Sequence, residues 1–401
     1  MIKMMVAHTA ESNDAEYAFQ EIMGQLGIPT GPAGKGSPLE GGKTLLRNSA
    51  GFLFCNLEFI QSGLVKELCA RLPFNVVGCV SQGFAVRDAG GDFMLTLTVL
   101  SSDDVEFSFG LSAPLVAGNE AVMEDLYRDL LKGGNPIAKP AMMLIFPPSL
   151  AHVTGNTIVR TLDRVSGGVP MFGSIPADFT VKMRSPMTIF NGEYYADRMS
   201  VVLLRGNISP RFFACSLPKE VNFDQDVTIT EVNGNRIISI DNMPAAAFLE
   251  KIGLITQGAI DIIYAFPIMV DYHDGSEPRL FAISKIDTDG ALISEQDIPV
   301  GGTIKIGTIE GELIIKSTRY SIEQIKEMPG KSGVLLISCI SRILTLQDSM
   351  EEITLIQQQM QDLPVPFLYF YSGGEICPLY KPGQDKPVNA FHQFTFVACI
   401  I

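Results

Sequence analysis

One pattern of apolar runs occurs three times along this chain of 401 residues, and it constrains the fold more than any other feature of the sequence. In each copy, a strand-like apolar run is followed by a segment with helical spacing and by a second apolar run that ends in small residues. A closing apolar strand completes the copy. A repeated unit indicates a composite scaffold, and we expect a site where its similar turns lie. The apolar runs of the three copies cover 51–56, 75–84 and 92–100, then 142–149, 169–179 and 198–206, and finally 333–341, 365–376 and 392–401.

The segments around these runs predict an α/β protein with mixed sheets and flanking helices. Residues 15–26 carry apolar side chains every three or four positions, which predicts a helix behind an N-cap near Asp14. Asn191 and Gly192 separate two strand-like runs and predict a tight hairpin, because both residues of such a turn take positive φ. From about residue 222 the chain is rich in alternating strands, and this β-rich segment separates the second copy from the third.

Composition and charge argue against several classes of partner. The net charge is −14 and no basic stripe is present, whereas nucleic-acid binding needs clustered Lys and Arg. The N-terminal apolar stretch is too short for a signal peptide, and the longest apolar segment, 258–270, is too short to span a bilayer. The seven cysteines are scattered without a CxxC pair, which is typical of buried thiols in a reducing compartment. We therefore expect a soluble, cytoplasmic protein with no nucleic-acid or membrane partner.

The loop at 31–44 resembles a phosphate-binding loop only in part. Gly42, Lys43 and Thr44 supply the second half of the pattern. The first glycine would have to stand at position 37, which is Ser37, and the preceding segment is helical and not a strand. A solvated loop is the favoured interpretation.

Two cysteines follow or end apolar strands and are candidates for a nucleophile. Cys79 precedes a polar turn, and Cys339 ends a strand of the third copy, where His392 could serve as its base. A reactive thiolate needs such a base or a positive field. The sequence contains no nucleophile elbow, so buried structural thiols are favoured and a cysteine-dependent hydrolase is kept as an alternative.

Asp271, His273 and Asp274 form the best cluster of potential metal ligands. Asp274 is followed by Gly275, a pair that is typical of a turn, so a polar turn is favoured over a metal or haem ligand. We expect no bound metal.

Glu375 follows two glycines directly after an apolar strand. A carboxylate in such a turn either braces the loop or contacts a ligand amine. Arg342, which follows a buried strand, and Arg279 are possible partners for a carboxylate, since Arg forms bidentate pairs. Structural ion pairing and ligand binding both remain open for these residues.

Taken in order, these segments resemble the FIST proteins, which combine an N-terminal and a C-terminal FIST domain. The family has a Gly-Cys-Ser-Thr-Ala-Gly-Glu turn, which Gly78, Cys79 and Gly83 match, while Val80 and Phe84 depart from it. The departures put a polar role of this first turn in doubt. Further positions that resemble family motifs are Gly173, Asp178, Asp241, Pro244, Ala245, Arg279, Asp287, Asp289, Gly290, Cys339, Arg342, Gly374, Glu375, Ile376, Pro378, His392 and Thr395.

The resemblance implies a FIST N-terminal-like α/β domain over 1–221 and a FIST C-terminal-like α/β domain over 222–401. It further implies a sensory module without catalysis that binds a small ligand, with an amino acid or a derivative proposed. Signalling would occur in trans, through a partner protein such as a kinase or cyclase. Some similar proteins bind haem and sense nitric oxide through a histidine, so a haem-binding gas sensor that uses His273 or another histidine is an alternative; otherwise no cofactor is expected.

We predict that the ligand site lies where the repeated turns meet. Glu375 would bind a ligand ammonium group and Arg342 a carboxylate, because a buried charged ligand needs such partners. The third turn keeps its polar residues, so we would substitute its residues first. The predicted ligand-binding residues are Cys79, Ser81, Gly173, Asp178, Cys339, Arg342, Ser372 and Glu375.

Overall fold

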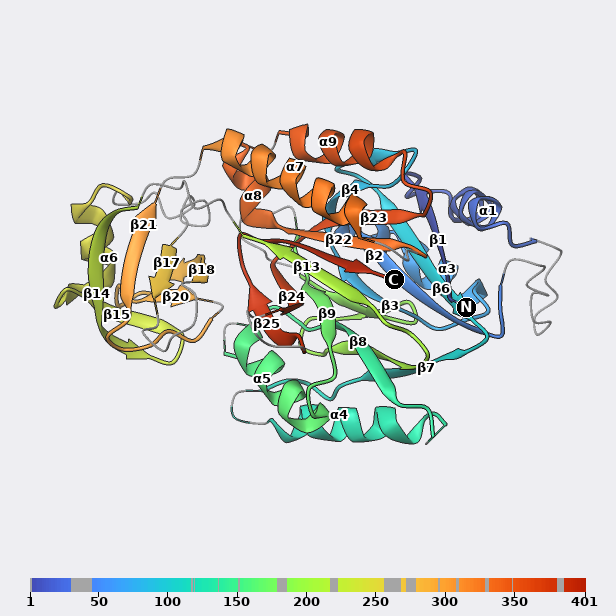
Figure 1. The fold of residues 1–401 in the computed structure, drawn as a ribbon, viewed down its shortest axis with the longest axis horizontal. Coiled ribbons are helices and arrows are strands. Elements are labelled where there is room, and N and C mark those ends of the chain that lie inside the picture. The colour runs from blue at the N-terminus through green and yellow to red at the C-terminus, as the bar shows by residue number, and fades with distance from the viewer. Residues whose placement is uncertain are drawn as a thin grey trace.

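A computed structural model gives the fold of the chain (Figure 1). It describes residues 2–29, 45–116, 118, 120–135, 137–150, 152–178, 186–216, 223–255, 268–271, 279–294, 296–307, 310–328, 332–347, 349–380 and 386–401.

Three units of like topology build a body of three sheets. Each unit contains an edge strand, a first strand, a helical segment, a second strand, a two-strand hairpin and a closing strand, in that order. Unit 1 consists of β1 (Ile2–Thr9), α1 (Ala15–Leu26), β2 (Asn48–Cys55), α2 (Leu57–Gln61), α3 (Leu64–Arg71), β3 (Val76–Val80), β4 (Gln82–Ala85), β5 (Gly90–Gly91) and β6 (Leu95–Ser102).

Units 2 and 3 repeat this order, and in both a helix lies between the edge strand and the first strand, as α1 does in unit 1. Unit 2 consists of β7 (Val105–Leu111), α4 (Ala121–Lys132), β8 (Pro140–Phe146), α5 (Gly155–Ser166), β9 (Met171–Ile175), β10 (Thr188–Phe190), β11 (Glu193–Tyr195) and β12 (Ser200–Gly206). Unit 3 consists of β13 (Arg211–Cys215), α7 (Gly311–Glu327), β22 (Val334–Cys339), α8 (Ile340–Thr345), α9 (Glu351–Met360), β23 (Phe367–Ser372), β24 (Gly374–Leu379), β25 (Val388–His392) and β26 (Phe396–Ile400).

The three sheets have the same strand order, and each is completed by a hairpin from another unit. In each sheet the first and second strands are parallel, and the closing strand is antiparallel to the first. The hairpin of unit 1 (β4–β5) extends the sheet of unit 3, that of unit 2 (β10–β11) the sheet of unit 1, and that of unit 3 (β24–β25) the sheet of unit 2. The units are therefore interlocked in a ring. The sheet orders are β1-β6-β2-β3-β10-β11, β7-β12-β8-β9-β24-β25 and β13-β26-β22-β23-β4-β5.

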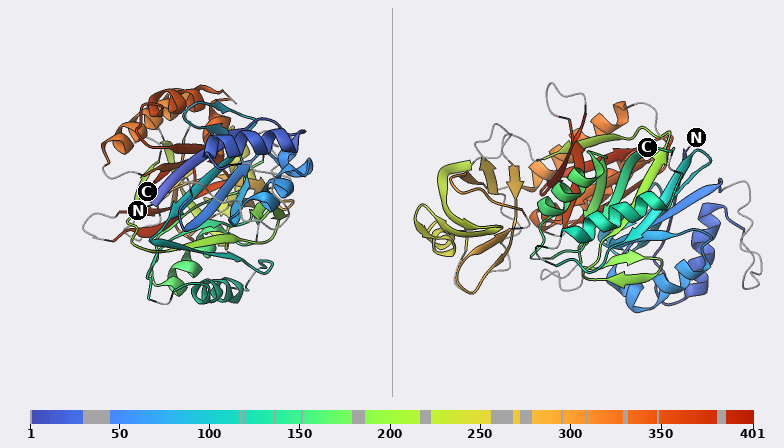
Figure 2. Two further views of the ribbon diagram at one scale, coloured as in Figure 1. Left: turned by 90° about the vertical axis from the view of Figure 1, so that its right-hand side faces the viewer. Right: turned by 90° about the horizontal axis from the view of Figure 1, so that it is seen from below.

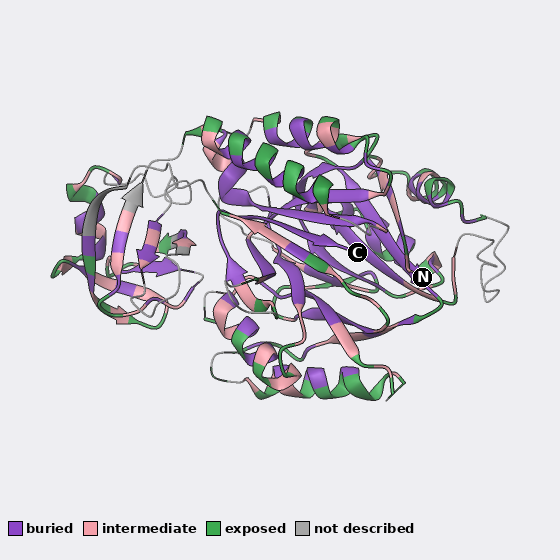
Figure 3. Ribbon diagram, viewed as in Figure 1, coloured by how far each residue is buried: buried purple, intermediate pink, exposed green. Residues whose placement is uncertain are grey.

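A central hydrophobic core joins the inner faces of all three sheets. Phe54 of unit 1 stacks on Phe370 of unit 3 with ring centroids 4.1 Å apart, and it also contacts Phe146 of unit 2 at 5.4 Å. Helices cover the outer faces, with α7 and α9 over one sheet, α4 and α5 over the second, and α1 and α3 over the third (Figures 1 and 2). The strands of the body are mostly buried, while the outward faces of α4 and α7 are exposed (Figure 3).

Between β13 and α7, unit 3 carries an additional β domain, which we define as residues 223–307. Its described strands pair only with one another and enclose their own hydrophobic core, so it lies to one side of the body (Figure 1). It consists of β14 (Phe223–Asn233), β15 (Arg236–Ile240), β16 (Met243–Pro244), α6 (Ala245–Lys251), β17 (Ile268–Asp271), β18 (Arg279–Phe281), β19 (Ile283–Ile286), β20 (Leu292–Ser294) and β21 (Thr303–Gly307).

The α/β fold class with mixed sheets and flanking helices is confirmed. The helix predicted over 15–26 is α1, and the Asp14 side chain caps it by accepting from the amide of Tyr17. The hairpin predicted at Asn191 and Gly192 joins β10 to β11, and both residues have positive φ. Across the described residues, no helix is both long enough and apolar enough to cross a bilayer. The division at 221/222 stays a prediction.

Candidate functional site

The three small-residue turns follow β3, β9 and β23, and hydrogen bonds join them in a ring. The Ala177 amide donates to the Val80 carbonyl at 3.2 Å, and the Gly373 amide donates to the Ile175 carbonyl at 3.0 Å. The Ser81 hydroxyl closes the ring by donating to the Tyr371 carbonyl at 2.5 Å. Each turn is thus bonded to the second strand of another unit. We call residues 79–84, 173–178 and 372–375 the turn cluster.

Six of the eight predicted ligand residues belong to this cluster. The hydrogen-bonded residues Ser81 and Tyr371 stand 290 positions apart in the chain, and the strand exchange brings such distant segments together. The Cys79 thiol of unit 1 lies close enough to the Ser174 hydroxyl of unit 2 to interact with it. Cys339, at the end of β22, lies beside the cluster, next to Glu375. The six members are Cys79, Ser81, Gly173, Asp178, Ser372 and Glu375.

Glu375 is the acid at the centre of the third turn, and it is completely buried. Its Oε1 accepts a hydrogen bond of 2.5 Å from the Ser372 hydroxyl, while its Oε2 has no partner within hydrogen-bond distance. Burial raises the pKa of this carboxyl to about 8, although Ser372, the Thr395 amide and the Cys339 thiol partly offset that effect. The group is therefore mostly protonated at neutral pH, with one oxygen free to bind a further group.

The two cysteines considered as nucleophiles lie in surroundings that disfavour the thiolate. Burial raises the pKa of the thiols of Cys79 and Cys339 to about 12, and the adjacent Glu375 contributes to the shift at Cys339. Neither therefore carries appreciable thiolate at neutral pH, which argues against their use as nucleophiles. The imidazole of His392, considered as a base, instead lies 2.9 Å from the carbonyl of Cys377 through Nε2. All seven cysteines are free, and only Cys215 is not buried.

Gly173 has a structural function that its place in a turn motif did not reveal. It lies in β9 opposite Ile145, and a Cβ there would stand 1.8 Å from the carbonyl oxygen of Ile145. Gly78 has the same relation to Leu53 in unit 1. Both glycines allow close approach of the parallel strands, and neither supplies a side chain to a ligand.

The first and third turns differ at the position of the acid. The matching hydrogen bonds place Val80, Ile175 and Tyr371 at equivalent positions, so Phe84 corresponds to Glu375. Phe84 is completely buried in the central core. At position 84, an apolar side chain of the central core therefore stands where the family pattern has an acid.

Arg342 makes none of its described hydrogen bonds to the turn cluster, although its charge lowers the pKa of Glu375. Its guanidinium donates from Nη2 to Glu352 Oε1 at 2.8 Å, and it also donates to α7, at Thr318 and Ser317. Both charged side chains are completely buried. The Tyr371 hydroxyl donates to Glu352 Oε2 at 2.7 Å, which joins β23 to the same network.

The sequence reasoning did not identify Glu352 as the partner of Arg342. Glu352 shares its helix face with Ile356 and Met360, all of them buried, although polar residues dominate this part of the sequence. The spacing of four residues was the one available signal that Glu352 faces the core.

Two predicted features lie outside the described residues: the loop at 31–44 and the turn that contains His273 and Asp274. The haem alternative that used His273 is therefore untested. Within the described parts of the chain, no three His, Cys, Asp or Glu side chains are grouped as metal ligands.

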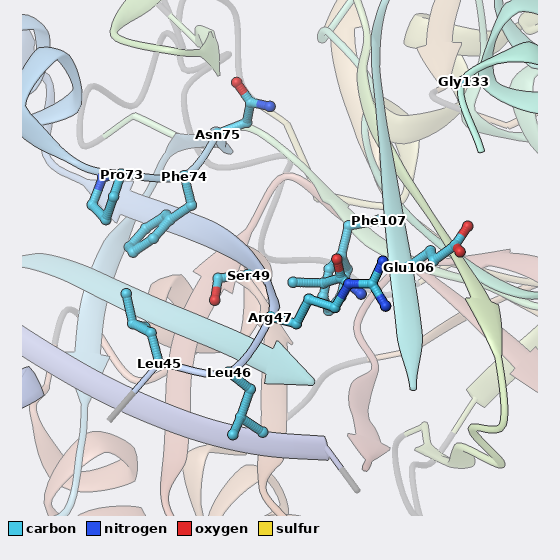
Figure 4. A pocket seen from close by; sticks show the side chains of 11 residues that line it. Leu45, Leu46, Arg47, Ser49, Pro73, Phe74, Asn75, Glu106, Phe107 and Gly133 are labelled. Carbon is cyan, nitrogen blue, oxygen red and sulfur yellow. The ribbon is translucent and has the colours of Figure 1, made fainter. Parts of the chain in front are cut away.

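A surface cleft of 580 Å³ lies at the opposite ends of β2 and β3 from the turn cluster (Figure 4). Phe74 and Phe107 contribute apolar surface to it, and Arg47 and Glu106 contribute charge. Glu106 is engaged by the Asn135 amide. The remaining residues around it are Leu45, Leu46, Asn48, Ser49, Pro73, Asn75 and Gly133.

Comparison with protein families gives two adjoining matches. The family model of the FIST N domain matches residues 49–243, and that of the FIST C domain matches residues 243–378. Together the matches cover most of the chain, and they meet in β16 of the β domain. No curated protein matches the chain significantly.

Proposed function

The chain belongs to the FIST family, whose domains are sensor domains of signal transduction, and on this premise we propose that it is a cytoplasmic sensor that binds a small ligand. FIST domains are sensory and not catalytic, which fits a chain in which burial disfavours the thiolate of Cys339. We place the ligand at the turn cluster.

The observation that carries this proposal is the buried carboxyl of Glu375. An acid without an ion-pair partner in the described structure, with one unpartnered oxygen, suits a ligand that brings a positive charge. The ammonium group of an amino acid or of a derivative has this chemistry. Because the pKa of Glu375 is about 8, ammonium binding would ionise the carboxyl and release a proton near neutral pH.

Recognition of a ligand carboxylate by Arg342 is a weaker part of the proposal. The guanidinium is engaged by Glu352 and by the hydroxyls of α7. Nη1 of Arg342 has no hydrogen-bond partner among the described residues, but a ligand carboxylate there would have to share the guanidinium charge with the buried Glu352. The arrangement favours ligands whose amine is the main charged group.

Signalling would then proceed in trans. We propose that a separate output protein, such as a kinase or a cyclase, reads the ligand-bound form of this chain. No nucleic acid, membrane or cofactor takes part in this proposal.

A thermal-shift screen with amino acids, their amides and simple amines tests the ligand. At about 100 times its Kd, a true ligand stabilises the folded state by about 2.7 kcal/mol, which raises Tm measurably. Glu375→Ala should abolish the rise. The control Glu351→Ala, which removes an exposed acid from α9, should keep it. If no compound raises Tm, or if Glu375→Ala responds like the wild type, the turn cluster is not the site.

A further inference from the structure

Residues 392–395 run from the last residue of β25 to the start of β26, and we call them the 392–395 link. They contact both the turn cluster and the β domain. All four residues are buried. His392 is paired with Glu375 across the ladder of β24 and β25. Phe394 is completely buried with φ at 56°, a left-handed conformation that a bulky side chain rarely adopts. Strain of this kind persists only where surrounding contacts impose it, and it is common in segments that switch.

One end of the link contacts the acid. The Thr395 amide lies close enough to Glu375 to lower the pKa of that carboxyl. The Thr395 carbonyl accepts from the Cys339 amide at 3.1 Å, and its hydroxyl donates to the Gln393 carbonyl at 2.8 Å. Thr395 therefore connects the surroundings of Glu375 to the backbone of Gln393.

The side chain of Gln393 reaches in the other direction, into the β domain. Its Oε1 accepts from the Ala282 amide at 2.9 Å and from Gln296 Nε2 at 3.2 Å. All three residues are buried. Gln296 also donates to the Leu280 carbonyl at 3.0 Å, so the Gln393 contact joins both β18 and the segment after β20.

A second contact between the β domain and the body is more exposed. Asp297 accepts from Thr154 at 3.2 Å and from Arg160 at 3.4 Å. Arg160 is 65% exposed, so water competes for this ion pair and it holds the domain weakly. Of these two contacts the Gln393 contact is the buried one, so its loss should weaken the docking of the β domain more.

We propose that the 392–395 link converts a change of charge at Glu375 into a change in how firmly the β domain is held against the body. The inference rests on the proposed function only in taking Glu375 as the group that the ligand addresses. A proton leaving the acid would then mimic the ionisation that a bound ammonium causes.

The physical step is solvation of a new buried charge. An ionised Glu375 has the Ser372 hydroxyl on Oε1 and no described hydrogen-bond partner on Oε2, so the nearby Thr395 amide would be drawn further toward the carboxylate. Movement of Thr395 alters the strained backbone at Phe394 and shifts Gln393, whose two bonds to the β domain then weaken. The other titratable or charged groups facing Glu375 are Cys339 at the end of β22, His392 on β25, Cys377 on its own strand and Arg342 on α8.

Hydrogen exchange of the segment around Ala282 measures the docking, because that amide donates to Gln393. Wild type and Glu375→Gln are compared at about pH 7 and about pH 9, each pair at the same pH so that intrinsic exchange cancels. The two should agree near pH 7. Near pH 9, exchange in the wild type should be about tenfold faster, as expected for loss of a buried hydrogen bond.

Two further variants identify the path. Gln393→Ala should exchange rapidly at both pH values, because it lacks the acceptor. Arg160→Ala is the matched control from the exposed contact, and it should behave as the wild type. If Glu375→Gln does not fold, exchange of the Ala282 amide in the wild type is measured across the pH range. A step near the Glu375 pKa of about 8 supports the link, provided that Gln393→Ala shows no such step.

Equal exchange in wild type and Glu375→Gln near pH 9, or unchanged protection of Ala282 in Gln393→Ala, overturns the inference. The exchange experiment uses no ligand, so its outcome is independent of the outcome of the thermal-shift screen. A link that responds to pH would stand even if no amine binds.

Discussion

At the scale of single residues, the protonation of Glu375 depends on its buried surroundings. An acid with one hydroxyl partner and a buried site is more stable with its proton than without it. The same burial keeps the thiols of Cys79 and Cys339 protonated. The Glu375 carboxyl and these two thiols are therefore neutral at rest, and a charge on Glu375 has to come from a ligand or from a change of pH.

This acid should make stability depend on pH. Its pKa rises from 4.5 to about 8 on folding, so between these values the folded state holds a proton that the unfolded state has lost. The stabilisation is complete below the lower value and is lost as pH rises through the upper one. Denaturant unfolding should therefore show wild-type stability falling by about 1.4 kcal/mol per pH unit relative to Glu375→Gln over this range. Parallel pH profiles of the two proteins would contradict the burial argument.

At the scale of elements, the Arg342 and Glu352 pair holds α7, α8, α9 and β23 together. Arg342 lies on α8 and Glu352 on α9, Thr318 comes from α7, and Tyr371 adds β23. The cost of removing water from both charges offsets most of their attraction. The pair therefore fixes how these elements are arranged more than it adds net stability.

Removing one partner should be far more harmful than removing both. Glu352→Ala leaves the Arg342 guanidinium buried without its acid, and we expect a loss of about 3–5 kcal/mol in the free energy of unfolding. The double variant Arg342→Met with Glu352→Leu, which fills the same space with apolar atoms, should recover most of that loss. A double variant as unstable as Glu352→Ala alone would show that the network contributes more than its charges.

The helix over 15–26 was predictable from sequence because its signals are local. Residues 15–26 have their apolar spacing and the Asp14 cap within one stretch of chain. The strand exchange was not predictable, because the ring that Ser81 closes with Tyr371 depends on pairing across 290 positions, which no local pattern encodes. Glu375 could be found as a polar residue after an apolar strand, whereas the partner of Arg342 could not, because the burial of Glu352 depends on how α9 packs.

At the scale of the whole molecule, three exchanged hairpins and one shared core make the body a single cooperative unit. Each sheet contains strands from two units, so no unit can unfold alone without opening another sheet. The β domain differs, because its described strands pair among themselves around a separate core.

Calorimetry should therefore resolve two transitions, one for the body and one for the β domain. Glu375→Gln, measured at about pH 9, should raise the transition of the body above that of the wild type, and it should also raise that of the β domain if the 392–395 link acts as proposed. Gln393→Ala should separate the two transitions further, because it removes a buried contact between the parts. Three transitions, one for each unit, would contradict the interlocked arrangement.

The exchange of hairpins also determines what happens if the chain is cut between β12 and β13. The N-terminal piece would keep β4–β5 without the sheet they extend, and would lack β24–β25 at the edge of β9. The C-terminal piece would keep β24–β25 without the sheet they extend, and would lack β4–β5 at the edge of β23. Each fragment would present an open sheet edge that its counterpart is shaped to fill, so the pieces should reassemble without a peptide bond. The protein is thus suited to fragment complementation, with reassembly itself as a reporter.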